Sequence, residues 1–188
     1  GEAGYQAQTL APGVYFGKWI WQYDITFQPF TIVPTGQLGL VLAKDGTELE
    51  TGMILGRKVA CDSFQDAEAF LVNGGRKGRQ TGIITPGSYR INTFLFNVEL
   101  TEMTSIPDNA VGIVTTQEGK PLEEQQIAGK IIDGHNKFQD VDIFMQNGGY
   151  KGLQEQVILA GTYFLNPWFA KVDMVNMMEI PIGHVGVV

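Results

Sequence analysis

The stretch Asn73-Gly74-Gly75-Arg76-Lys77-Gly78-Arg79-Gln80 decides how this chain folds, because it occurs again as Asn147-Gly148-Gly149-Tyr150-Lys151-Gly152-Leu153-Gln154. Its last part has a third copy, Gly4-Tyr5-Gln6. From Gln6 to Gln80 is 74 positions, and from Gln80 to Gln154 is 74 again. A constant period of this length indicates tandem copies of one supersecondary unit.

Working outward from this stretch, the rest of each copy has the pattern of a β-sheet. Large apolar residues alternate with polar ones at 19–27, 94–100 and 169–175, which predicts three equivalent half-buried strands. Runs of small and branched residues predict further strands at 38–42 and 110–115. Charged turns centred on Gly46 and Gly119 follow, and we expect the strands after them, 53–60 and 126–132, to complete hairpins.

One short helix is expected in each copy, at 63–71 and at 136–145. Phe64, Ala67 and Phe70 are spaced to share one helical face, and the second copy repeats this spacing. Asp66 and its counterpart Asp140 lie near the start, where a carboxylate satisfies free backbone amides. The Asn-Gly-Gly triplet then ends the helix, because glycine accepts the left-handed conformation found at helix C-caps.

The sequence therefore predicts a mainly β fold of tandem modules of about 74 residues, each a small twisted or barrel-like sheet with one short helix. The expected divisions are 1–32 as the end of a truncated repeat, 33–106 and 107–180 as two modules, and 181–188 as the start of a further repeat. The boundary between the modules should fall near Ser105 to Asp108. Because both ends lie partway through a unit, we expect a longer protein.

Composition limits the classes of function. A formal charge of -7 argues against nucleic-acid binding, which depends on basic side chains that neutralise phosphates. Cys61 is the single cysteine, and the two histidines, His135 and His184, do not have the spacing of zinc ligands. We expect no metal, no cofactor and no catalytic residues. No run approaches the roughly 20 apolar residues that span a bilayer, so these 188 residues are expected to be soluble.

The glycine-rich stretches are the candidate binding sites. They lack the P-loop order of glycine, lysine and serine or threonine before a helix, so their glycines are first explained by backbone geometry. The alternative is that the loops bind an anion, such as a phosphate or a lipid head group, through backbone amides and lysine. The residues that this hypothesis assigns are Gly74, Gly75, Arg76, Lys77, Arg79, Gly148, Gly149 and Lys151.

Two further features leave alternatives open. Five basic residues fall close together in the first copy, and they form either a solvated face or a patch for lipid head groups or an acidic partner; these are Arg57, Lys58, Arg76, Lys77 and Arg79. Gln6, Gln80 and Gln154 recur at one position of the repeat, and we expect each to hydrogen-bond a neighbouring turn.

Short motifs in each copy resemble the opening of the SPFH, or band 7, family of stomatin-, prohibitin- and flotillin-like proteins. The resemblance is carried by Ile106-Pro107, Val111-Gly112-Ile113-Val114, Gly119, Ile84-Thr85-Pro86-Gly87-Ser88-Tyr89 and Asn92, with their repeats up to Ile180–Val188. These pieces amount to about a third of the chain. The long C-terminal helical coiled coil of the family is absent from this sequence, and the helix that ends in Asn-Gly-Gly is additional to the family pattern.

The resemblance implies a non-enzymatic scaffold or interaction module in a membrane-associated assembly, with self-association or protein partners and no catalytic residues to transfer. Membrane association would then reside in parts of the protein outside this sequence. The competing hypothesis is the small-ligand or anion-binding module described above.

Overall fold

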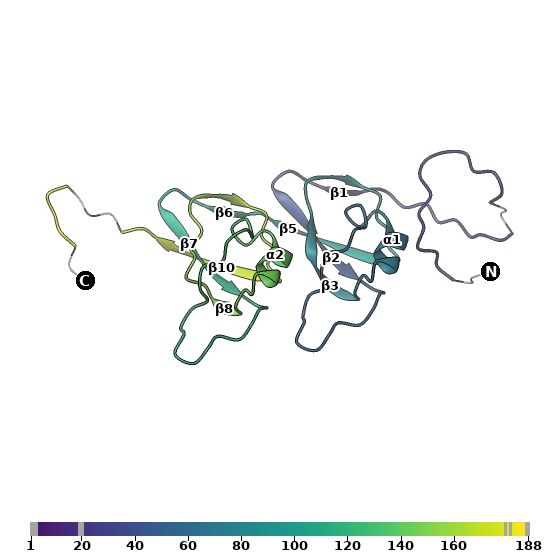
Figure 1. Cartoon of the computed structure of the whole chain (residues 1–188). Coiled ribbons are helices and arrows are strands. Elements are labelled where there is room, and N and C mark those ends of the chain that lie inside the picture. Colours follow the sequence, from purple (N-terminus) through teal and green to yellow (C-terminus); the bar gives the residue numbers. More distant parts are fainter. Residues whose placement is uncertain (1–3, 19–20, 179, 181, 187–188) are drawn as a thin grey trace. The chain divides into compact units, whose positions relative to one another are not determined.

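Two runs of small and branched residues form the central strands of two three-stranded antiparallel sheets. In the first, β2 (Gln37–Ala43) lies between β3 (Gly78–Ile84) and β5 (Phe96–Glu102). A two-stranded sheet accompanies it, in which β1 (Thr31–Val33) pairs with β4 (Gly87–Tyr89). This computed structural model describes residues 4–18, 21–178, 180 and 182–186, and Figure 1 shows these elements.

The second set of strands repeats the first. Here β7 (Ala110–Thr116) lies between β8 (Gly152–Leu153) and β10 (Ala170–Asn176), and β6 (Thr104–Ile106) pairs with β9 (Gly161–Tyr163). The chain divides into two units, unit 1 (Gly1–Glu102) and unit 2 (Met103–Val188). The expected mainly β fold with one short helix per unit is confirmed, and the sheets of the described residues do not close into a barrel.

An aromatic cluster joins the helix to the sheet in each unit. In unit 1, Phe70 of α1 (Ala67–Val72) packs edge-on against Phe96 of β5, with ring centroids 5.0 Å apart, and Phe64 lies 5.4 Å from the same ring. In unit 2, Phe144 of α2 (Val141–Gln146) meets Phe169 at 5.3 Å. All five rings are buried. The helical spacing seen in the sequence therefore marks the side chains that form each core.

The helices begin later than the sequence pattern indicates. Asp66 and Asp140 are the N-caps, and their carboxylates accept hydrogen bonds from Ala69 N (2.8 Å) and Ile143 N (3.0 Å). The residues before them, 62–64 and 136–138, have positive φ values of 46° to 66° and form a left-handed turn. Phe64 and its counterpart therefore reach the core from this turn, which places their rings beside the helix without a helical backbone.

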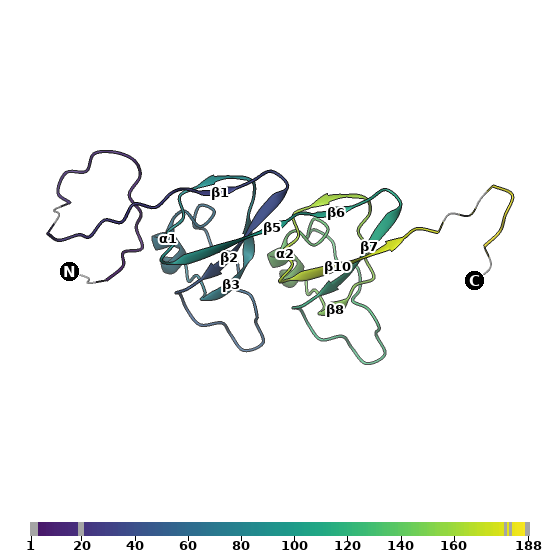
Figure 2. The ribbon, with the colours of Figure 1, turned by 180° about the vertical axis from the view of Figure 1, so that it is seen from behind.

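The prediction of a hairpin after Gly46 and another after Gly119 is wrong. No strand forms at 53–60 or 126–132 in the described structure, and these segments contribute single parallel bridges, Gly56 to Gln80 and Gly129 to Gln154. Because β2 and β7 already have partners on both sides, the chain after Gly46 or Gly119 leaves the sheet as a long loop. Figure 2 shows one such loop in each unit, below β3 and below β8.

The N-terminal segment also departs from the prediction. The expected strand at 19–27 begins with two residues that lie outside the described ones, and Trp21–Phe27 is irregular and exposed. Its counterparts, β5 and β10, pair with β2 and β7, and no strand of the described structure pairs with Trp21–Phe27. Alternation alone does not form a strand when no partner supplies the ladder. The segment from Ile180 onwards has no strand among its described residues, and 181 and 187–188 lie outside them.

Candidate functional site

The candidate loops begin as helix C-caps. Asn73 and Asn147 are the C-cap residues, and their backbone amides donate to Ala69 O and Ile143 O. The glycine after each asparagine has a left-handed backbone, with φ of 77° at Gly74 and 82° at Gly148. The sequence prediction that Asn-Gly-Gly ends the helix is confirmed.

The second glycine of each triplet is required by close packing. A Cβ at Gly75 would lie 2.5 Å from the ring of Phe70, and a Cβ at Gly149 would lie 2.1 Å from the ring of Phe144. Both rings are buried and fixed by the aromatic clusters, so they have no space into which to move. The conformation and packing of the fold therefore explain Gly74, Gly75, Gly148 and Gly149 without a ligand.

The backbone amides of the loops are already hydrogen-bonded. Gly75 N donates to Phe70 O at 2.7 Å, and Lys77 N donates to Thr47 O at 2.9 Å. In unit 2, Gly149 N donates to Phe144 O and Lys151 N to Lys120 O, at 2.9 and 2.8 Å. An anion-binding nest needs successive amides that point into a free concavity. These amides point into the protein instead, so an anion would have to rely on the side chains.

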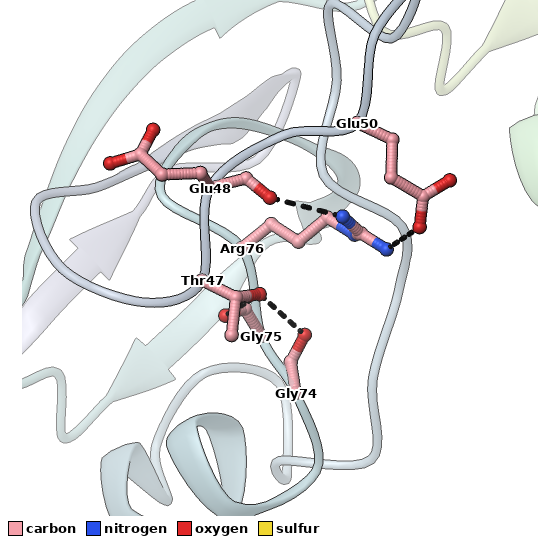
Figure 3. Close-up of polar contacts among 6 residues, drawn as sticks. All are labelled: Thr47, Glu48, Glu50, Gly74, Gly75 and Arg76. Atoms are coloured by element: carbon pink, nitrogen blue, oxygen red, sulfur yellow. Dashed lines mark hydrogen bonds and ion pairs between the residues drawn. The ribbon is translucent and has the colours of Figure 1, made fainter.

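The basic side chains of the first loop have different surroundings. Figure 3 shows Arg76, which donates to Glu48 O at 3.1 Å and pairs with the carboxylate of Glu50. Thr47 lies beside it and donates to the carbonyl of Gly75. In unit 2, Tyr150 replaces Arg76 and its hydroxyl reaches Glu123 Oε1 at 3.5 Å. Unit 2 therefore keeps a side-chain contact to a glutamate at this place, but without the positive charge.

Three lysine and arginine side chains of the hypothesis remain exposed, namely Lys77, Arg79 and Lys151. Lys77 and Lys151 have no hydrogen bond or ion pair from their side chains in the described structure. The structure does not gather them with the glycine amides into one concave site. Within each loop, a single exposed lysine is what stays available to an anion.

The repeated glutamines act as internal braces. Gln80 is 1% exposed and its amide donates to Arg76 O and Gly78 O, at 2.6 and 2.8 Å. Gln154 does the same with Tyr150 O and Gly152 O and also donates to Thr116 Oγ1. The expected bond to a neighbouring turn is confirmed for both residues. The third copy, Gln6, is exposed and donates to Gly4 O at 3.3 Å.

Cys61 and His135 occupy one position of the repeat, each at the start of the left-handed turn. The thiol of Cys61 is buried, and burial raises its pKa above the usual value, with the nearby Asp66 and Asp62 adding to the effect. His135 is 1% exposed; its Nδ1 accepts from Phe138 N at 2.7 Å and its Nε2 lies 3.1 Å from Gln156 Oε1. Both residues are thus structural members of the core.

Neither a metal site nor a membrane span is found among the described residues. No three His, Cys, Asp or Glu side chains there lie close enough together to hold a metal ion. The helices found in that part of the chain are both too short to cross a bilayer.

Sequence reasoning missed a built corner in unit 1. Asn92 is 7% exposed, and its side-chain amide donates to two carbonyls of the N-terminal segment, Gln6 O (3.1 Å) and Ala7 O (3.0 Å). The available signal was the repeat itself, since Asn92 and Asn166 occupy one position of the repeat, 74 residues apart.

Comparison with known proteins adds no relative. No family model matches the chain, and neither the curated proteins nor the solved structures contain a match.

Proposed function

We propose that this chain is a non-enzymatic scaffold module that binds protein partners, further copies of itself included, within a membrane-associated assembly of the SPFH kind. The observation that carries the interaction role is an open sheet edge in each unit. β5 and β10 are seven-residue strands that lie at the edge of their sheets and are paired on one side only in the described structure.

The hydrogen bonds between β2 and β5 show which backbone groups of β5 point away from the sheet. Lys44 N donates to Leu95 O, one step beyond the Ala43 and Phe96 pair. Hydrogen-bonded and non-bonded pairs alternate along an antiparallel ladder, so the amides of Val98 and Leu100 point away from β2.

The same geometry recurs in unit 2. Gln117 N donates to Phe169 O, and Met177 N donates to Asn109 O, at the two ends of the pairing between β10 and β7. The amides of Val172 and Met174 therefore point away from the sheet. An open edge of this kind accepts an added strand through main-chain hydrogen bonds.

Apolar side chains accompany both edges. Leu100 is 48% exposed in β5, and Met174 and Val175 are 54% and 46% exposed in β10. Glu99 and Asp173 interrupt these apolar positions, which limits indiscriminate pairing. An edge that combines free backbone groups with apolar side chains supports selective association.

The membrane-associated part of the proposal rests on the SPFH resemblance. Its motif residues lie on framework positions: Val111–Val114 within β7, Pro107 in the turn before it, and Gly87–Tyr89 as β4. A resemblance that is confined to framework positions, with no catalytic residues to transfer, supports a role in assembly and assigns no chemistry.

The edge is tested by a proline at an outward amide. Met174→Pro removes a backbone donor that the ladder does not use, whereas Met174→Thr keeps the donor and the strand propensity. In sedimentation velocity of the full chain over a concentration series, we expect wild type and Met174→Thr to associate, and Met174→Pro to weaken the association roughly ten-fold or more. Equal association of Met174→Pro and Met174→Thr would contradict the edge.

The anion-binding alternative is tested separately at the two exposed lysines. Lys77→Ala with Lys151→Ala should leave the melting temperature nearly unchanged, because neither side chain makes a hydrogen bond or ion pair in the described structure. Loss of inorganic phosphate or anionic vesicle binding in the double variant, but not in the control Lys130→Ala, would support this alternative. The absence of binding in wild type would remove it.

A further inference from the structure

One of the two open edges carries charges of both signs. In β10, Lys171 and Asp173 are exposed, and they lie on the same face of the strand because they are two residues apart. Across the ladder with β7 they face Thr115 and Ile113, which carry no charge. Neither charged side chain has an ion pair or a hydrogen bond in the described structure. The edge of β10 therefore offers a positive and a negative charge to a strand that pairs with it.

The backbone of β10 limits how a second strand can pair with this edge. Val172 and Met174 direct their amides away from β7, whereas the amide of Ala170 already donates within its own turn. In an antiparallel pair, hydrogen bonds join residues whose backbone groups face the partner strand. Val172 and Met174 must therefore lie in hydrogen-bonded pairs with the added strand. Lys171 and Asp173 then lie in the non-bonded pairs, where side chains come closest.

A second copy of β10 satisfies this rule and pairs both charges. If the two strands run antiparallel with Val172 opposite Val172, then Lys171 of each copy lies opposite Asp173 of the other. Moving the two-fold axis by one residue sets Lys171 against Lys171 or Asp173 against Asp173, and like charges directly opposite destabilise a sheet. Lys171 and Asp173 are the only charged residues of β10, so no other register within the strand brings opposite charges together.

The same register also matches the apolar face and the backbone. Met174 is 54% exposed and would cover Ala170 of the other copy, a small residue that is 3% exposed. The two Val172 side chains would meet across the axis, as a pair of branched residues on a pleated surface. Val172 N would donate to Val172 O of the other copy, and Met174 N to Ala170 O. The outward amides thereby find acceptors without any change in the sheet.

The edge of β5 lacks this complementarity. Asn97 and Glu99 occupy the positions of Lys171 and Asp173, 74 residues earlier in the repeat. The same register between two β5 strands would therefore set an amide against a carboxylate and form no ion pair. The two copies of the repeat thus differ at the positions that the pairing uses.

We propose that β10 of this chain pairs with β10 of a second copy, antiparallel and centred on Val172. All the residues of the contact belong to unit 2. The contact uses the same residues on both copies, so it closes as a dimer, and β5 stays open for a further strand at higher concentration. This inference rests on the proposed function, and it names the partner and the register of one of its two edges.

The decisive experiment mixes two charge variants of the full chain in sedimentation velocity over a concentration series. Lys171→Glu leaves only acidic side chains at the pairing positions and Asp173→Lys leaves only basic ones, so each variant alone should associate roughly ten-fold more weakly than wild type. In an equal mixture every pair joins opposite charges, and association should return to within about three-fold of wild type. A mixture as weak as its components, single variants that associate like wild type, or a wild type that stays monomeric would overturn the proposal.

Glu99→Lys is the matched control, because it makes the same change at the equivalent position of β5. It should form the dimer as wild type does, and a loss equal to that of Asp173→Lys would overturn the pairing of β10 with itself. Association that Met174→Pro weakens, with no recovery in the mixture, would overturn this inference and leave the proposed function standing. Equal association of Met174→Pro and Met174→Thr would instead contradict the edge itself.

Discussion

At the scale of the residue, the repeated glutamine is the most constrained polar group of the loop. Gln154 is 4% exposed and its amide serves three acceptors, Tyr150 O, Gly152 O and Thr116 Oγ1. The sequence predicted both its recurrence in the repeat and its hydrogen bond to a neighbouring turn. It did not predict the partner Thr116, because this residue comes from β7, which is distant in sequence.

Gln154→Ala should therefore destabilise the protein by about 1 to 3 kcal/mol, since it removes a buried donor and leaves the single hydroxyl of Thr116 to serve both Tyr150 O and Gly152 O. Gln146→Ala is the matched control, because Gln146 is exposed at the end of α2 and should change stability by less than about 0.5 kcal/mol. Urea denaturation of both variants measures the difference. Equal midpoints would show that the brace contributes nothing.

Cys61 offers a second test at this scale. Because burial raises the pKa of its thiol, the native protein should react with iodoacetamide at pH 8.5 at least about ten-fold more slowly than the protein in strong denaturant. The sign for stability follows: a thiol held protonated in the native state stabilises it less as the pH rises above the pKa of the unfolded thiol. Cys61→Ala should lack this alkaline loss. Equal reactivity in the native and denatured protein would contradict the buried thiol.

At the scale of the element, periodicity located the paired strands and failed where no partner was available. The alternation at 94–100 and 169–175 appears as β5 and β10, shifted by two residues and by one. The same alternation at Trp21–Phe27 forms no strand, and the segments after Gly46 and Gly119 form single bridges. Sequence patterns report which face is apolar, and pairing then depends on long-range partners that a local pattern does not contain.

The helix starts were misplaced for a local reason. Asp62, Ser63 and Phe64 have φ values of 48°, 53° and 64°, which residues other than glycine seldom adopt and which no periodicity predicts. The steric strain of a left-handed residue falls when the residue is replaced by glycine, which has no Cβ. Ser63→Gly should therefore stabilise the protein by up to about 1 kcal/mol, whereas Ala69→Gly within α1 should destabilise it by a similar amount. Thermal unfolding compares the two, and a destabilising Ser63→Gly would contradict the strained turn.

At the scale of the whole molecule, the repeat in the sequence predicted two copies of one fold, and both units have the same order of elements. Both units use the glycine-rich loop in the same way. Its glycines end the helix and pack against the core, and its amides are hydrogen-bonded within the unit. The sequence indicated those loops as the candidate site, but the open edges and the Asn92 corner depend on pairings far apart in the chain.

The central claim is that this chain is an interaction module whose open sheet edges bind protein. Hydrogen–deuterium exchange of the full chain, at low and at high protein concentration, tests it most directly. The account predicts that the outward amides of β5 and β10, at Val98, Leu100, Val172 and Met174, gain protection at high concentration, while the amides of the exposed loop at Glu123–Gln125 do not. Identical exchange of those four amides at both concentrations, in a sample that sedimentation shows to be associated, would contradict it.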